Sequence, residues 1–418
     1  MASSLPWRDR RGGVTAIGPG ALDPLIVRRQ FPGTANGIYL DSSAHALLPL
    51  GAQAAVARYF DDCIDAGGRS ATMAEPIARV RAKFAALIGA HPDEIAIVRS
   101  VSEGINAVVA SLQWQTGDNA IVCPAMEHPN GLYALYNMRQ RHGIEVRKLA
   151  PNASLGFPAD ALADAIDQNT RLVIASTVAF ASGARTDIDA LARICRERNV
   201  LLLLDGAQSI GALDFDVRHT APDALAAGAS KYLCGPSGFG FLYVRRAVAE
   251  RIAPVWLARR GVDLGDAHPG EAGGEDYKLM PAARRFEVGS HNYAGANATE
   301  VSLDLIAGAR VAAIEKHILG LAQRLTGGLA SLGVPLISGA HDQHFSHIVV
   351  AGRAHPDPDC ASLLQGLHDH LAAGGVKLAS RHGRLRFSFH FYNTPDEVER
   401  VLALVGEGLA MHRSRVRG

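Results

Sequence analysis

The sequence contains few features of membrane, secreted or nucleic-acid-binding proteins. It has five cysteines in 418 residues and no CxxC pair, which argues against both a disulfide framework and a zinc–thiolate site. No stretch approaches the ~20 apolar residues of a membrane span, and the N-terminus lacks the apolar core of a secretory signal. The formal net charge of +1 indicates neither nucleic acid nor an anionic membrane as a partner. We therefore expect a cytoplasmic protein.

The order of apolar patterns predicts an α/β protein. Residues 94–244 alternate short aliphatic runs with helical patterns, which is typical of βαβ units on a parallel sheet. The run 200–204 is apolar on both faces, as expected of a central strand covered by helices. The predicted strands are 95–98, 120–123, 145–149, 172–175, 200–204 and 239–244, and helices are expected at 160–166 and 187–197.

The second half of the chain predicts a smaller domain. Glycine and proline in residues 260–281 favour a long surface loop. Later patterns predict helices at 294–332, 361–373 and 395–412 and strands at 346–351 and 385–391. This mixture is typical of an α+β domain. We expect an irregular N-terminal arm (1–40) that belongs to the small domain, a large domain (41–293, with the loop 260–281) and a small C-terminal domain (294–418).

Two charged residues occupy positions suited to ligand chemistry. Asp205 ends the apolar run 201–204, at the strand end where open α/β sheets bind ligands. A carboxylate there is costly to bury unless a cation or hydrogen-bond donors meet it. Lys231 follows the small-residue run 226–230, which lets a ligand approach the backbone closely. Partial burial would lower the pKa of its amine and make it nucleophilic.

The combined pattern resembles the aminotransferase class V family. The resemblance rests on Asp-Gly-Ala-Gln at 205–208, the small-residue segment that ends in Lys231, and the glycine-rich run 235–244. It extends from about residue 39 to residue 394 and is closest to the cysteine desulfurase and isopenicillin N epimerase-like branch. It implies the pyridoxal 5'-phosphate (PLP)-dependent transferase fold type I, with a mainly parallel seven-stranded sheet in the large domain. It also implies PLP as the cofactor.

The resemblance assigns roles around the cofactor ring. Lys231 would carry PLP as a Schiff base, and Asp205 would pair with the pyridine nitrogen. A protonated ring nitrogen makes the ring an electron sink for a substrate Cα carbanion. Gln208 would donate to the ring hydroxyl oxygen, and His128, in Met-Glu-His-Pro-Asn at 126–130, would stack on the ring.

Phosphate binding is expected at the start of a helix. Residues 100–106 follow a predicted strand and open a helix, so their free amides and hydroxyls favour an anion. The expected phosphate ligands are Ser102, the amides of Val101 and Ser102, and Ser230. Ser290 resembles the family residue whose hydroxyl reaches the phosphate of the neighbouring subunit. The resemblance therefore implies a homodimer with shared active sites.

Arg386 aligns with the family arginine that binds the substrate carboxylate, where a planar guanidinium gives a bidentate clamp. Cysteine desulfurases carry a nucleophilic cysteine shortly before this arginine, but residues 375–384 contain none. Cys360 lies upstream in a helical pattern, so we predict a core position for it. Histidines at 341, 344 and 347 are spaced by three, which places neighbours on opposite faces of a strand. No metal site is expected.

Three functions stay open. The preferred one is a PLP-dependent lyase that acts on a free amino acid by β-elimination, for example of a C–S bond. The alternative is a class V aminotransferase or amino-acid epimerase, and the remote one is a non-catalytic PLP-fold binding protein. The complete set of Lys231, Asp205 and Arg386 disfavours the third. The lyase is preferred by analogy, because cysteine-free members of this branch include C–S lyases.

Overall fold

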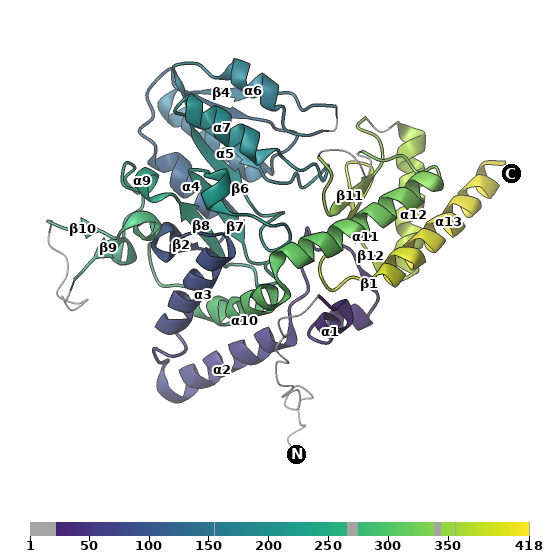
Figure 1. The fold of residues 1–418 in the computed structure, drawn as a ribbon, viewed down its shortest axis with the longest axis horizontal. Helices are drawn as coiled ribbons and strands as arrows, with labels where there is room; N and C mark the ends of the chain where they lie inside the picture. The colour runs from purple at the N-terminus through teal and green to yellow at the C-terminus, as the bar shows by residue number, and fades with distance from the viewer. Residues whose placement is uncertain (1–21, 154, 266–274, 338–343, 356, 418) are drawn as a thin grey trace.

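A seven-stranded sheet forms the centre of the molecule (Figure 1). The computed structural model describes residues 22–153, 155–265, 275–337, 344–355 and 357–417. The strand order is β2-β8-β7-β6-β5-β3-β4, and only β8 runs antiparallel to its neighbours. The strands are β2 (Ile95–Val98), β3 (Asn119–Val122), β4 (Glu145–Lys148), β5 (Thr170–Ser176), β6 (Leu201–Asp205), β7 (Ala224–Gly228) and β8 (Gly240–Val244). The predicted mainly parallel sheet is confirmed.

Helices cover both faces of this sheet, as the apolar strand sequences predict. In β6, Leu203 packs in the cluster under one set of helices, while Leu202 and Leu204 pack on the opposite face. Apolar residues of α4 (Val101–Ser111) and α5 (Pro129–His142) cover the face of Leu203. The other face is covered by α3 (Ala74–Leu87), α6 (Ala159–Ala165) and α7 (Ile188–Glu197). This layering places the ends of the strands between the helices.

Strand β7 is absent from the sequence-based prediction. Its sequence Ala-Leu-Ala-Ala-Gly is short of the β-branched and aromatic residues that signal a strand. Its pairing with β6 and β8 in the sheet makes it a strand, and its small side chains let α4 pack close to it. A Cβ added to Gly104 of α4 would lie 3.1 Å from the Cβ of Ala226. Small residues on both elements thus bring the start of α4 beside the end of β7.

The chain after residue 293 forms a second group of elements. Helices α11 (Val311–Ser331), α12 (Pro358–Ala373) and α13 (Pro395–Arg417) lie together at the C-terminal side (Figure 1). The strands here form an antiparallel sheet in the order β11-β14-β13, with β11 (Ile348–Ala351), β13 (Ala379–Arg381) and β14 (Arg384–Ser388). Helix α10 (Tyr293–Ala309) instead packs on α2 (Leu50–Ala66) and α3.

Several predicted boundaries in this region are wrong. The single helix expected at 294–332 is two helices, because Arg310 has a φ of +63°. Helix α12 begins before residue 361, since the Asp357 side chain caps it by accepting from the Cys360 amide. The strand expected to reach residue 391 ends at Ser388, because His390 and Asn393 bond to each other in a turn.

The stretch 260–281 is not entirely a loop. Within it β9 (Val262–Asp263) pairs antiparallel with β10 (Lys278–Leu279), while 266–274 lie outside the described residues. Short elements complete the chain: α8 (Val217–Thr220), α9 (Arg246–Ala249) and 3-10 turns at Pro32–Ala35, Pro92–Glu94, Arg259–Gly261 and Ala282–Phe286.

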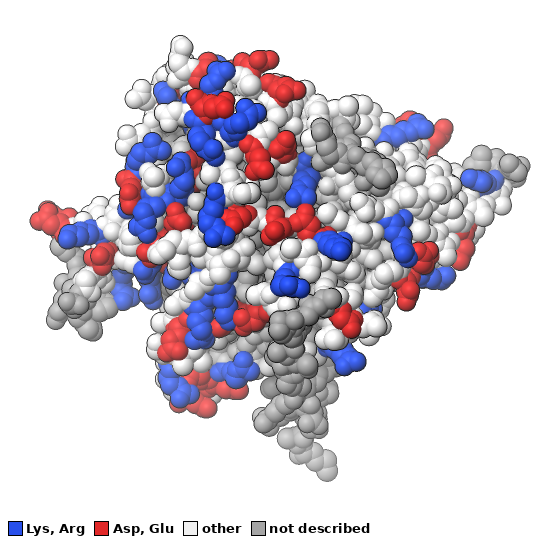
Figure 2. Space-filling view, viewed as in Figure 1, with Lys and Arg blue, Asp and Glu red and all other residues white. Residues whose placement is uncertain are grey.

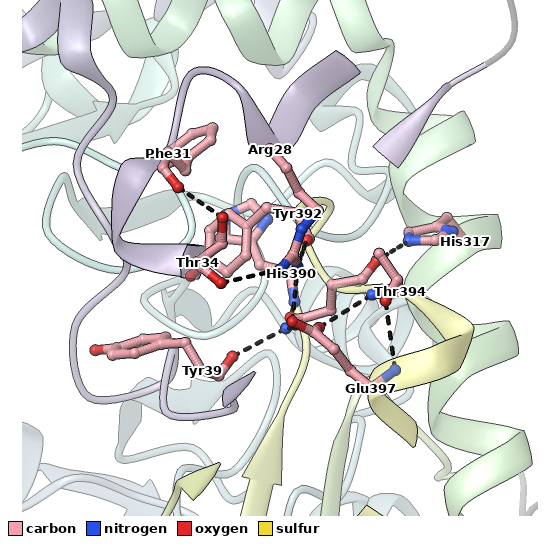
Figure 3. A network of polar contacts seen from close by, with 10 residues as sticks. Arg28, Phe31, Thr34, Tyr39, His317, His390, Tyr392, Thr394 and Glu397 are labelled. Carbon is pink, nitrogen blue, oxygen red and sulfur yellow. Dashed lines mark hydrogen bonds and ion pairs between the residues drawn. The ribbon is translucent and has the colours of Figure 1, made fainter. Parts of the chain in front are cut away.

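The described part of the N-terminal arm, residues 22–40, is more regular than predicted and is fixed to the C-terminal elements, while residues 1–21 lie outside the described residues. It forms α1 (Pro24–Arg28) and β1 (Ile38–Tyr39), and β1 pairs in parallel with β12 (Val376–Lys377). Figure 3 shows the polar contacts that hold the arm. Arg28 donates to the carbonyl of Tyr392 (2.9 Å) and to the carboxylate of Glu397 (2.7 Å). The described part of the arm is therefore anchored to the residues around the start of α13.

The distribution of charged side chains on the surface agrees with the composition of the sequence. Basic and acidic side chains are mixed over the face shown in Figure 2, in keeping with the formal net charge of +1. In the part of the chain that the structure describes, every helix is too short or too polar to cross a membrane.

Candidate active site

A cavity of about 280 Å³ lies where the carboxyl ends of β6 and β7 meet the amino end of α4. Open α/β sheets bind their ligands at this edge. Six of the predicted site residues line it: Val101, Ser102, His128, Asp205, Ser230 and Lys231. The other lining residues are Arg99, Ser100, Asn130, Ala207, Gly228, Ser237, Gly238 and Phe239. The structure thus brings these six residues together around one cavity.

Asp205 is a buried carboxylate that lacks a cation. It is 6% exposed, and its Oδ1 accepts a hydrogen bond from the Ala207 amide (2.9 Å). Burial raises the pKa of Asp205, and the Lys231 charge opposes this only in part. Among the described residues Asp205 forms no ion pair. A protonated pyridine nitrogen in the cavity would supply the missing positive charge, so this residue fits the expected cofactor.

Lys231 is held beside this carboxylate by the turn that follows β7. The Cys234 amide donates to the Lys231 carbonyl (3.0 Å), and the Gly235 amide donates to the Ala229 carbonyl (2.8 Å). Burial lowers the pKa of the Lys231 amine. A larger neutral fraction makes the amine a better nucleophile toward a carbonyl carbon, as attachment of PLP requires.

The first turn of α4 supplies donors for an anion. Ser100 caps this helix, because its Oγ accepts a hydrogen bond from the Glu103 amide (3.2 Å). The amides of Val101 and Ser102 belong to the first turn, where no helical carbonyl is available to them. Together with the positive end of the helix dipole they fit a phosphate group.

His128 lines the cavity, whereas Gln208 is buried and does not line it. His128 immediately precedes α5, and its ring meets the ring of Phe180 edge-on at 5.2 Å between centroids. Burial and the nearby Lys231 lower the pKa of His128, which favours a neutral ring that can stack. Gln208 is buried behind the cavity, where its Nε2 donates to the Ser43 carbonyl (3.1 Å). One amide hydrogen of Gln208 remains for a ring oxygen.

Arg386 also lies behind the cavity wall. It is 2% exposed, and its guanidinium donates to the Phe180 carbonyl (2.8 Å) and to Asp41 (3.2 Å). The Nε of Arg386 has no partner among the described residues. The role of Asp41 was not predicted, although it lies in the segment 39–43 where the family resemblance begins. A substrate carboxylate would share this guanidinium with Asp41.

Ser290 lies outside this cavity. It is exposed and lines an adjacent cavity of about 590 Å³, which shares Arg99, Gly238 and Phe239 with the first. Its predicted use by a neighbouring subunit stays a prediction.

Of Cys360 and the histidines at 341, 344 and 347, those that the structure describes do not line the cavity. Cys360 is buried in α12, as predicted. His344 bonds to the Arg185 carbonyl (2.8 Å), His347 is fully buried, and His341 lies outside the described residues. The described part of the chain contains no group of three or more histidine, cysteine or acidic side chains that could hold a metal ion.

Comparison with known proteins identifies the family of this chain. The family model of aminotransferase class V matches residues 38–401. A probable cysteine desulfurase of Methanothermobacter thermautotrophicus is 30% identical over 92% of this chain and 96% of its own. Isopenicillin N epimerase of Streptomyces clavuligerus is 27% identical over 79% of this chain and 84% of its own.

Solved structures share the fold. A cystine C–S lyase, solved with its product cysteine persulfide, superposes with a TM-score of 0.80 at 24% identity, over 90% of this chain and 99% of its own. A variant of that lyase was solved with glycine covalently linked to its PLP cofactor. The chain described here belongs to the aminotransferase class V family, and its cofactor is pyridoxal 5'-phosphate.

Proposed function

We propose that the protein is a lyase that breaks a bond at Cβ of a free amino acid, with a C–S bond as the preferred target. The observation that carries this proposal is the connection between β13 and β14. It consists of His382 and Gly383, both with positive φ, as in a tight two-residue hairpin. Desulfurases need a cysteine on a loop at this place, and a closed turn without cysteine cannot deliver a thiolate to the substrate sulfur. The reaction must then end without transfer of sulfur to the protein.

The remaining side chains suffice for elimination. When bound, PLP withdraws electrons from the substrate Cα and so makes its proton acidic. Lys231 would hold the cofactor and, once the substrate is bound, would serve as the base for that proton. Asp205 holds the ring nitrogen protonated, and Arg386 binds the substrate carboxylate. Loss of a thiolate from Cβ then needs no further nucleophile.

The other cysteines near the site offer no substitute. Cys123 and Cys234 are buried, and burial raises the pKa of the Cys123 thiol to about 11 and that of Cys234 further. Cys234 also contacts the ring of His390 and does not line the cavity. Buried thiols of high pKa are inert.

The alternative is an aminotransferase or an epimerase, since removal of the Cα proton begins all three reactions. A non-catalytic PLP-binding protein is disfavoured, because binding alone does not require a buried lysine, a buried aspartate and a substrate arginine together. We also propose a homodimer, in which the exposed Ser290 reaches the phosphate of the partner subunit.

A panel of amino acids separates these outcomes. With cysteine, cystine and cysteine S-conjugates we expect a change in cofactor absorbance together with pyruvate and ammonia in equal amounts. A transaminase would instead form a keto acid only when an acceptor keto acid is present, and an epimerase would change optical rotation without either product. Absorbance changes without any product would indicate binding only and contradict the proposed lyase.

Single replacement of each cysteine by serine or alanine is expected to leave turnover within about twofold of the wild type. The reason is that no thiolate takes part in the elimination. Turnover is measured on whichever amino acid gives products in the panel, with cofactor content as the control for folding. A variant that keeps its cofactor but loses activity would contradict the elimination and indicate a desulfurase-like reaction.

A further inference from the structure

Glu127 is a buried carboxyl group without a role in the reaction described so far. It lies between β3 and α5, directly before His128, and is 3% exposed. The Ser176 amide donates to its Oε1 (2.6 Å), and the Ser176 hydroxyl contacts its Oε2 (2.8 Å). Helix α5 closes over it, since a Cβ added to Gly131 would lie 4.0 Å from Oε2 and 3.4 Å from Ile174. The contacts of Glu127 are therefore specific and shielded from solvent.

These contacts connect the two residues expected at the cofactor ring. Ser176 ends β5 and is the register partner of Asp205, which ends β6. The next residue, Thr177, donates to the Asp205 carbonyl through its amide (3.0 Å) and its hydroxyl (3.1 Å). Glu127 thus ties the backbone of His128 to the strand end that fixes Asp205.

The charges around Glu127 favour its neutral form. Asp205, at the end of β6, and Cys123, which follows β3, both interact electrostatically with Glu127, and His128 is its neighbour in sequence. Among the described residues it forms no ion pair with a lysine, arginine or histidine. Burial, followed by the Asp205 charge, raises the pKa of Glu127 to about 8. A protonated carboxyl also satisfies both contacts, because its O–H donates to the Ser176 hydroxyl while the other oxygen accepts from the Ser176 amide.

We propose that Glu127 is a positioning residue that, as a neutral acid, holds His128 against the cofactor ring and leaves Asp205 as the only negative charge near the ring nitrogen. The proposal rests on the cofactor placement used in the proposed function but not on the reaction catalysed. A carboxylate in place of the acid would add a second buried, unpaired charge. It would also raise the pKa of nearby cationic groups.

The test compares the bound cofactor in the wild type, Glu127→Gln and Glu127→Leu. An amide is neutral and can make both contacts with Ser176, so it mimics the protonated acid; leucine has a similar size and makes neither. Absorbance is recorded without substrate from pH 6 to pH 9.5, and cofactor affinity is measured by titrating the apoprotein with PLP. Glu399→Gln, an exposed glutamate on α13, is the matched control.

We expect the wild type and Glu127→Gln to have the same spectrum at pH 6.5 and different spectra above pH 8, where only the wild type gains a charge. We expect Glu127→Leu to bind PLP at least tenfold more weakly with an altered spectrum at all pH values. Different spectra of the wild type and Glu127→Gln at pH 6.5 would show that Glu127 is ionised and overturn the neutral form. A wild-type spectrum and affinity in Glu127→Leu would overturn the positioning role.

Heat denaturation gives a second measurement of the same ionisation. The folded state keeps the Glu127 proton up to about pH 8, whereas an unfolded glutamate loses it near pH 4.3. Between these values the folded state binds more protons, so the wild type loses stability as pH rises and the loss ends near pH 8. Relative to the wild type, Glu127→Gln should therefore gain in melting temperature from pH 5 to pH 8; a constant difference would contradict the raised pKa. All these readouts omit substrate, so a wrong assignment of the lyase reaction would not affect them.

Discussion

Replacing Lys231 with alanine is expected to abolish covalent attachment of PLP and to reduce turnover by at least about 10³-fold. The variant loses both the buried amine that attacks the cofactor carbonyl and the base for the substrate Cα, and a general base alone contributes about 10²–10⁴-fold. The measurement is borohydride reduction followed by peptide mapping. In the wild type the phosphopyridoxyl label should be found on Lys231, and in the variant on no residue.

Lys316→Ala is the matched control, because Lys316 is an exposed lysine on α11. It should retain the label on Lys231 and full turnover. A label that mapped to another residue in the wild type would remove Lys231 from its proposed role. The experiment does not depend on the identity of the amino-acid substrate.

Replacing Asp205 with asparagine is expected to reduce turnover by several orders of magnitude, about 10³-fold or more, by analogy with other general acid–base and electrostatic groups in enzyme sites. A neutral amide cannot hold the ring nitrogen protonated, so electrons from Cα are no longer stabilised in the ring. The proposed phosphate ligands at the start of α4 are unchanged, and we therefore expect the variant to retain PLP. Activity, cofactor content and absorbance are measured together.

The same substitution should not destabilise the fold. Burial raises the pKa of Asp205, which means that its charge is unfavourable in the protein without a cation beside it. The asparagine side chain can still accept a hydrogen bond from the Ala207 amide, as Asp205 does. We expect an apoprotein melting temperature equal to or above that of the wild type. Near wild-type turnover in the variant would exclude Asp205 from the catalytic role.

Local patterns were enough to predict most of the sheet and the centre of the site. The apolar run before Asp205 defines a strand and its end, and the position of that end explains why the carboxylate faces the cavity. Lys231 follows a run of small residues that is visible in sequence. Strand β7 could not be predicted in the same way. Its alanines and glycine allow close packing against α4 but have low strand propensity.

Contacts between distant segments were beyond sequence reasoning. Asp41 pairs with Arg386 across 345 positions, and Glu127 meets Ser176 across 49. Neither acid has a local pattern that distinguishes it from a surface carboxylate. The break at Arg310 was also unpredictable, since the apolar spacing continues through it and only the backbone angle reveals two helices.

The contact between Asp41 and Arg386 has a consequence for biosynthesis. The sheet that presents Lys231 and Asp205 is complete once residue 244 has been made. The guanidinium of Arg386, the proposed substrate ligand, emerges from the ribosome more than a hundred residues later, and its contact with Asp41 can form only then. Contacts of such long sequence separation form late, because closing the loop between them is entropically costly. A nascent chain can therefore acquire its cofactor pocket well before it can select a substrate.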